Sequence, residues 1–148
     1  MGNLIQKGFL KLEGPKFQGD SDVDGHKEEI AVLDLSFGVT QAGKYEESPK
    51  TIITNASDVS VRKYMGASSP ELSQACAKKT PIKKAVISFP GRLTLTLEKV
   101  IVTGVNPSLN VEEDLPTEVI TLGYRKAEWT YEAEKGKGTG AFDLDKLA

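Results

Sequence analysis

The sequence predicts a mainly β protein, with long, bent strands that suit a sheet curling into a barrel and one short helix beside it. Most of the chain alternates apolar and polar residues with the period of two that a half-buried strand requires. Two of these runs exceed the usual upper strand length of about ten residues, and both change their apolar phase midway. Only one segment shows the start, apolar stripe and stop of a helix.

The shorter β-rich runs come first along the chain. They are GFLKLEG (8–14), EEIAVLDLSF (28–37), NASDVSVRKY (55–64) and IKKAVISF (82–89). In the second of them, Leu33 and Leu35 share an apolar face with Phe37, whereas the opposite face is apolar only at its start. We therefore expect residues 28–37 to form one strand with a mostly apolar side.

The two long runs carry more information about the shape of the sheet. In LTLTLEKVIVTGV (93–105) the apolar phase shifts after Glu98, and in TEVITLGYRKAEWTYE (117–132) it shifts at Arg125. A shift in a period-two pattern indicates a β-bulge, a bend, or a strand that passes from one environment into another. Both runs are predicted to bend at these points.

The one predicted helix is SSPELSQACAKK (68–79). Ser68 and Glu71 have the spacing of a capping box, and the lysines at the end suit the negative end of the helix dipole. Cys76 lies on the short apolar stripe of this helix, where a free cysteine usually fills the core.

Three segments are predicted to be loops. Residues 38–54 form an excursion too long for a tight hairpin, and long insertions of this kind are often functional surfaces. Residues 106–116, NPSLNVEEDLP, form a second, acidic loop. The glycine-rich stretch EKGKGTGAF (134–142) is expected to be mobile.

Composition limits the possible classes of function. The 148 residues fit one domain, 1–148, with a real core, and the net charge of −2 argues against a dedicated nucleic-acid binder. No run approaches the length of a membrane helix, so we expect no membrane insertion, and the N-terminus lacks the apolar core of a cleaved signal peptide. The single cysteine rules out a disulfide within the chain.

The stretch DSDVDGHKEEI (20–30) begins like an EF-hand calcium loop, with aspartates at alternate positions followed by glycine. An EF-hand loop closes with a glutamate at its twelfth position, which here is Ala31, and a β-rich segment follows in place of a helix. The simplest interpretation is a solvated acidic turn. A weak cation site formed by Asp20, Asp22 and Asp24 remains the alternative.

No pattern in the sequence predicts catalysis, a cofactor or a metal site. A Ser-His-Asp or Cys-His site needs a histidine, and His26 is the only one, with no nucleophile-elbow motif in the chain. The 21 acidic residues always permit some pair of carboxylates, so an unrecognised hydrolase has no specific support. The basic run KKTPIKK (78–84) suits a solvated helix end or a contact with an acidic partner.

The order and spacing of several pieces resemble the Hcp family of the type VI secretion system. These pieces are FLKLEG, GDSDVDGHKEEIAVLDLSFGVTQ, DVSVRKYMGASSPELSQACA, TLEKVIVTGV, LGYRKAEWTYE and GAFDLDK, and they cover most of residues 8–146. The chain departs from the family at Leu35 and Phe37, where tryptophans are usual. This apolar substitution should not change the fold.

The resemblance implies a closed or nearly closed antiparallel β-barrel that assembles as a homohexameric ring without catalytic activity. In this family the rings stack into a tube that sheath contraction expels with its spike, with effectors in the lumen. It also implies assembly in the bacterial cytoplasm followed by secretion without a cleaved signal peptide. His26 would then either hold the acidic turn or meet a neighbouring subunit.

By the same resemblance, residues 38–54 are the predicted contact with an adjacent subunit or ring. The residues assigned to this contact are Gln41, Lys44, Tyr45, Glu46, Glu47 and Lys50. The alternative function is a monomeric β-barrel that binds a ligand or metal at the aspartate turn or at the barrel mouth.

Overall fold

The computed structural model describes residues 7–46, 52–112 and 114–147 of the chain. Its elements, in chain order, are β1 (Gly8–Glu13), β2 (Ile30–Val32), β3 (Asp34–Ser36), β4 (Val39–Gln41), β5 (Thr54–Ala56), β6 (Val59–Tyr64), α1 (Ser69–Lys78), β7 (Ile82–Phe89), β8 (Leu93–Ser108), β9 (Thr117–Gly123), β10 (Lys126–Ala133) and β11 (Gly136–Asp143). The predicted mainly β class with one helix is confirmed.

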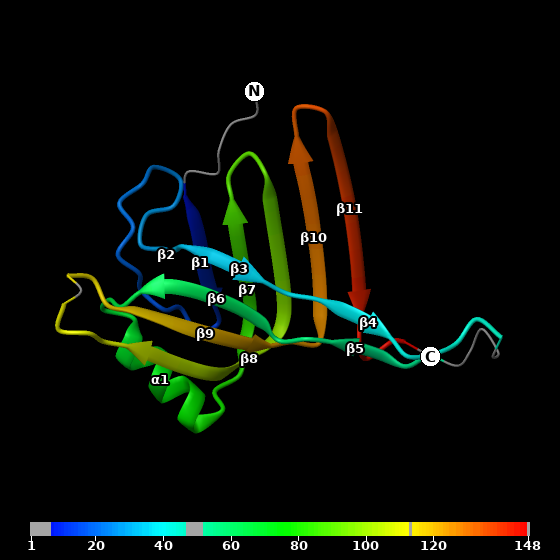
Figure 1. The fold of residues 1–148 in the computed structure, drawn as a ribbon, viewed down its shortest axis with the longest axis horizontal. Coiled ribbons are helices and arrows are strands. Elements are labelled where there is room, and N and C mark those ends of the chain that lie inside the picture. The colour runs from blue at the N-terminus through cyan, green and yellow to red at the C-terminus, as the bar shows by residue number, and fades with distance from the viewer. Residues whose placement is uncertain (1–6, 47–51, 113, 148) are drawn as a thin grey trace.

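The strands form two sheet regions that share β8 (Figure 1). The first half of β8 pairs with β7 on one side and β10 on the other, and the sheet continues to β1 and β2 and to β11. The second half pairs with β9, which is followed by β6 and β3. Every ladder is antiparallel, as the alternating sequence pattern predicts for strands with one solvated face.

The sheets are not closed into a barrel, so the predicted closed or nearly closed barrel is wrong for the single chain. β2 and β3 stand at opposite ends of the strand order, although only Leu33 separates them along the chain. The N–H of Leu33 donates to the carbonyl of Arg62 at 2.7 Å, but no ladder joins the two ends among the described residues. The chain crosses from one sheet region to the other here.

This crossing also corrects the prediction of one strand over residues 28–37. Ile30 and Val32 are buried, whereas beyond the crossing it is Leu35 and Phe37 that pack against the core, so the buried face changes at Leu33. The strand begins at Ile30, because the acidic turn occupies the residues before it.

Both predicted bends in the long runs are present. In β8, Lys99 has a φ of 56°, and the ladder with β7 passes from the pair Lys84–Glu98 directly to Ile82–Val100. The second run is divided into β9 and β10, which pair with successive halves of β8. The core lies between the two sheets and α1, and Cys76 packs partly buried against it, as predicted.

The helix occupies the predicted segment, but its predicted capping box is wrong. Ser68 is the N-cap with φ −76° and ψ −15°, and its side chain makes no capping hydrogen bond. A capping side chain needs the extended backbone of the β region, and Ser68 already has helical angles. The helix ends at Lys78, and the C-cap residue Lys79 is left-handed and donates its backbone N–H to the carbonyls of Ala75 and Cys76.

The glycine-rich segment is a strand, which corrects the prediction of a mobile loop. β11 pairs with β10 residue by residue from Lys126–Asp143 to Ala133–Gly136. The backbone hydrogen bonds of this ladder order the segment, although its glycines have no side chains that could pack. The chain after β11 then turns back toward the bend of β8 at Lys99.

A single carboxylate holds this C-terminal turn to both bends. Asp145 accepts from Lys99 Nζ at 2.8 Å and from Arg125 Nε at 2.9 Å. These hydrogen bonds, the Lys99 one foremost, hold the pKa of Asp145 below its ordinary value. The hydrogen bond to Asp145 likewise raises the pKa of Lys99. We call Asp145 together with Lys99 and Arg125 the clamp. Beside it, the N–H of Leu144 donates to the Arg125 carbonyl at 2.7 Å.

We expect Asp145→Asn to release this turn while the core stays folded. A carboxylate with a lowered pKa stabilises the fold above its ordinary pKa, and the contribution is lost as pH falls through the lower folded pKa. The wild type should therefore lose the clamp only in acid below about pH 4, and the variant should lack it at neutral pH. Faster amide exchange at Leu144, measured by NMR, reports the release.

Asp34→Asn is the matched control, because Asp34 also forms an exposed ion pair, with Arg62 at 2.7 Å, elsewhere on the sheet. Its substitution should leave the exchange rate of Leu144 unchanged. Equal exchange in Asp145→Asn and the wild type would contradict the clamp.

Candidate assembly surfaces

The segment between β3 and β6 is an extended hairpin, not an open loop. β4 and β5 form their own two-stranded sheet, which runs past the lower end of β11 and away from the body (Figure 1). Gln41 orders this hairpin. Its Oε1 accepts from the N–H groups of Gly43 and Ile53, both at 2.7 Å, and its Nε2 donates to Thr54 Oγ1 at 3.1 Å.

The predicted contact residues divide into two groups. Gln41 bonds within the hairpin, whereas the side chains of Lys44, Tyr45 and Glu46 lie at its exposed end, where Tyr45 is fully solvent-accessible. Glu47 and Lys50 lie outside the described residues. The stem adds apolar surface at Val39 and Ile53, so the hairpin presents both apolar and charged groups.

The far end of the larger sheet region, which comprises β2, β1, β7, the first half of β8, β10 and β11, is a second exposed surface. β11 is its last strand, and within the described residues no strand pairs with its outer edge. Trp129 and Tyr131 on β10 lie opposite Gly140 and Gly138, and a side chain at either glycine would meet nothing within 4 Å. Trp129 packs edge-on against Phe37 with ring centroids 5.6 Å apart, yet both aromatic side chains remain exposed and add apolar surface to this face. An unpaired edge of this kind is a template for pairing with another chain.

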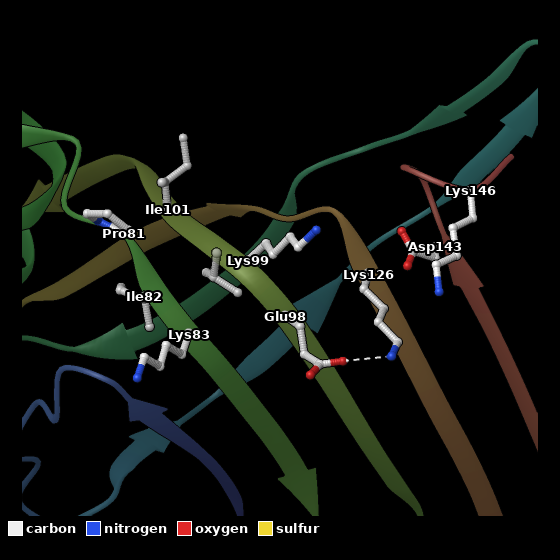
Figure 2. A pocket seen from close by; sticks show the side chains of 10 residues that line it. Pro81, Ile82, Lys83, Glu98, Lys99, Ile101, Lys126, Asp143 and Lys146 are labelled. Atoms are coloured by element: carbon white, nitrogen blue, oxygen red, sulfur yellow. Dashed lines mark ion pairs between the residues drawn. The ribbon is translucent and has the colours of Figure 1, made fainter.

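A groove of about 610 Å³ lies where the bend of β8 at Lys99 meets the starts of β7 and β10 and the end of β11 (Figure 2). We call it the lysine groove. The residues that line it are Pro81, Ile82, Lys83, Glu98, Lys99, Val100, Ile101, Lys126, Asp143 and Lys146. Lys126 pairs with Glu98 at 3.2 Å, and Lys99 pairs with Asp145 just outside the groove. Four lysines against two carboxylates leave the lining positive.

The acidic turn is solvated and held by its own residues, as the sequence predicts. Asp20, Asp22 and Asp24 are exposed, and no group of three metal-ligating side chains comes together in the ranges that the structure describes. His26 stacks on Phe9 with ring centroids 4.1 Å apart, and its Nδ1 lies 3.0 Å from Glu29 Oε1. Of its two predicted roles, His26 therefore holds the turn.

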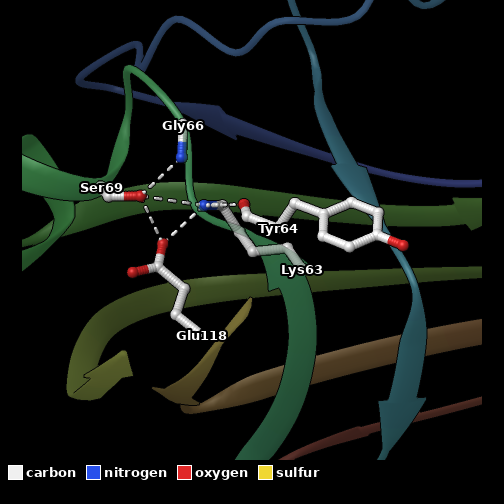
Figure 3. Close-up of polar contacts among 5 residues, drawn as sticks. All are labelled: Lys63, Tyr64, Gly66, Ser69 and Glu118. Carbon is white, nitrogen blue, oxygen red and sulfur yellow. Dashed lines mark hydrogen bonds and ion pairs between the residues drawn. The ribbon is translucent and has the colours of Figure 1, made fainter. Parts of the chain in front are cut away.

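A buried polar cluster joins α1 to the smaller sheet region, which is formed by the second half of β8 with β9, β6 and β3, and the sequence did not point to it directly (Figure 3). Lys63 Nζ and Glu118 Oε1 are 2.5 Å apart, and the two side chains are 2% and 1% exposed. Ser69, the first residue of α1, donates to Glu118 at 2.7 Å and accepts from Lys63 at 3.2 Å and from the N–H of Gly66 at 3.0 Å. Lys63 also donates to the Tyr64 carbonyl at 2.9 Å. Every charge is therefore compensated.

The sequence did contain a signal for this pair. Lys63 continues the phase of Val59 and Val61, and Glu118 precedes Ile120 and Leu122 in theirs, so each charge occupies a position on a buried face. The two residues are direct partners in the β6–β9 ladder. A charge in phase with an apolar face indicates a buried pair only once the neighbouring strand is known.

Within the described residues, no helix is long and apolar enough to cross a membrane.

Comparison with known proteins identifies relatives across nearly the whole fold. A sequence model of the family described as "Type VI secretion system effector, Hcp" matches residues 9–131. The protein hcp1 of Pseudomonas aeruginosa is 32% identical over 140 residues, which cover 88% of this chain and 85% of that protein.

Solved structures agree with this match. The crystal structure of a type VI secretion system effector from Yersinia pestis is 26% identical with a TM-score of 0.77, over 92% of this chain and 98% of that one. The crystal structure of Hcp1 from Salmonella typhimurium is similar in fold, with a TM-score of 0.81 at 24% identity over 95% and 96% of the two chains.

Removing one partner of the buried pair should destabilise the protein far more than removing both. Lys63→Met leaves Glu118 buried without its cation, and Glu118→Leu leaves Lys63 without its anion, so each should cost about 3–5 kcal/mol. The double variant replaces the pair by apolar groups and should be close to the wild type. Urea unfolding measures all three free energies.

Arg62→Met serves as the control, because the Arg62–Asp34 pair is exposed and should contribute at most about 1 kcal/mol. A double variant no more stable than the single ones would contradict this explanation. The destabilisation by each single substitution would then not come from a buried charge left without its partner.

Proposed function

Because the chain belongs to the Hcp family of type VI secretion system proteins, we propose that it is a structural subunit of the inner tube of that system and not an enzyme. The observation that carries the proposal is the family match over residues 9–131, which spans β1 to β10. Similarity in fold to family structures over more than nine-tenths of the chain supports treating residues 1–148 as one domain.

The proposed assembly is a homohexameric ring. A ring forms when one surface of a subunit meets a different surface of the next and the rotation closes. The single chain has unlike surfaces of the kind required, namely the hairpin and the free edge of β11 with its exposed aromatic face. The contact residues proposed on the hairpin are Lys44, Tyr45 and Glu46, together with Glu47 and Lys50, while Gln41 shapes the hairpin that presents them.

Rings of this kind would stack into a tube that a contracting sheath expels together with a spike, with effectors carried in the lumen. The subunits would assemble in the bacterial cytoplasm and then leave the cell without a cleaved signal peptide. The family assignment supports this route and disfavours the alternative of a monomeric ligand- or metal-binding barrel.

The mass in solution tests the ring. Light scattering should give about six times the 16.0 kDa of the chain. A particle that stays at the mass of one chain at high concentration would contradict the proposal and favour the monomeric alternative, which a calcium titration by calorimetry then addresses.

Tyr45→Ala should weaken assembly without changing the stability of the subunit, because this side chain is fully exposed in the single chain. A tyrosine at the centre of an interface typically contributes about 2 kcal/mol to the binding free energy. Its loss should therefore raise the protein concentration at which half of the subunits are assembled by roughly thirtyfold. Dilution followed by light scattering and electron microscopy measures ring size and stacking.

Tyr64→Ala is the matched control, an exposed tyrosine on β6 away from the hairpin. If Tyr45→Ala assembles like the wild type, and deletion of residues 43–50 also leaves ring size and stacking unchanged, the hairpin is not a contact.

A further inference from the structure

We propose, building on the proposed assembly function, that the acidic loop between β8 and β9 of one copy docks into the lysine groove of a second copy. The described residues of the acidic loop are 109–112 and 114–116. This docking identifies a subunit contact that is separate from the hairpin and from the edge of β11.

The acidic loop exposes apolar side chains to an unusual degree. Leu109 is 69% exposed, Val111 104% and Leu115 60%, whereas large aliphatic side chains are normally buried. Exposed carboxylates at Glu112 and Asp114 lie between them in the chain. A short segment that alternates exposed apolar and acidic groups is complementary to a surface that is both apolar and basic.

The structure holds this loop out from the sheet. Asn110 Oδ1 accepts from the N–H of Glu112 at 2.9 Å, which forms a tight turn with Val111 at its tip. At the base, the Pro116 carbonyl accepts from the N–H of Met65 at 2.9 Å. A loop fixed at its base and turned at its tip loses less conformational entropy on docking than a free segment would.

The lysine groove has the matching chemistry. Pro81 and Ile101 add accessible apolar surface above the buried side chains of Ile82 and Val100. Lys83 and Lys146 lie on opposite sides of the lining, with the Glu98–Lys126 pair between them (Figure 2). Neither Lys83 nor Lys146 forms an ion pair with another residue that the structure describes.

Other acidic segments fit the groove less well. The turn at Asp20 to Asp24 is acidic, but its one large apolar side chain, Val23, is partly covered. At the hairpin tip, Lys44 offsets the charge of Glu46. Among the described segments, the acidic loop is therefore the one that combines negative charge with several exposed aliphatic groups.

The two surfaces lie on different parts of the subunit. The acidic loop projects at the left of Figure 1, beyond β6 and β9, whereas the groove is built at the lower ends of β7, β10 and β11. Their contact between copies is therefore heterologous and links each copy to a next one, as a ring or a stack requires.

Disulfide trapping tests the contact. In a Cys76→Ser background, Val111→Cys and Lys146→Cys are introduced together, and the assembled protein is oxidised. Because each copy then links to a different copy through each cysteine, non-reducing gels should show a ladder beyond the dimer. Each single-cysteine variant should give at most a dimer. The matched control is Tyr45→Cys with Lys146→Cys. It would form a ladder only if the hairpin occupied the groove, so we expect no ladder from it.

The outcomes separate this contact from the ring itself. A particle of six chains with no ladder overturns the docking and leaves the proposed ring intact. A ladder from a particle of another size supports the docking and overturns the hexamer. A ladder from the Tyr45 control but not from Val111 assigns the groove to the hairpin and overturns the docking.

Charge exchange gives a second, reversible test. Lys83→Glu with Lys146→Glu should raise the concentration for half-assembly by about tenfold or more, because carboxylates then face carboxylates. Adding Glu112→Lys and Asp114→Lys to the same chain should restore assembly. Failure of the restored charge pattern to recover assembly, with circular dichroism showing folded protein, would overturn the docking.

Discussion

The buried ion pair between Lys63 and Glu118 is the interaction on which the arrangement of the smaller sheet depends. The two residues face each other across the β6–β9 ladder, and Ser69 at the start of α1 bonds to both. A shift of register by one residue would leave two charges buried without partners, which costs far more than the loss of an apolar contact. One cluster therefore sets the register of two strands and the position of the helix against them.

The second constraint is that one strand serves two sheets. β8 pairs with β7 and β10 along its first half and with β9 along its second, and the left-handed Lys99 at the bend marks the change. The same bend places Lys99 beside Arg125, where Asp145 bonds to both. The groove thus forms at this bend of β8, where residues 98–101 lie beside the starts of β7 and β10.

An open sheet leaves unpaired strand edges, and these bear on the proposed assembly. A closed barrel would satisfy its own backbone and present only side chains, whereas β11 keeps an unpaired edge beside two exposed aromatic residues. The hairpin and the acidic loop add surface that the single chain does not cover. These are the surfaces on which the proposed contacts between copies are based.

The sequence by itself determined the properties that local pattern encodes. Period-two alternation identified the strands, the phase shifts at Glu98 and Arg125 located both bends, and the order of motifs identified the family that the comparisons then showed. The hairpin residues assigned to assembly came from that resemblance and remain a prediction.

Only the tertiary structure decided which distant residues meet. It paired Lys63 with Glu118, moved the chain between sheets at Leu33, and ordered the glycine-rich segment as β11. The lysine groove likewise combines side chains from four separate segments. The physical reason is that alternation reports the environment of each face along one strand, whereas pairing, closure and grooves depend on contacts between strands far apart in the chain.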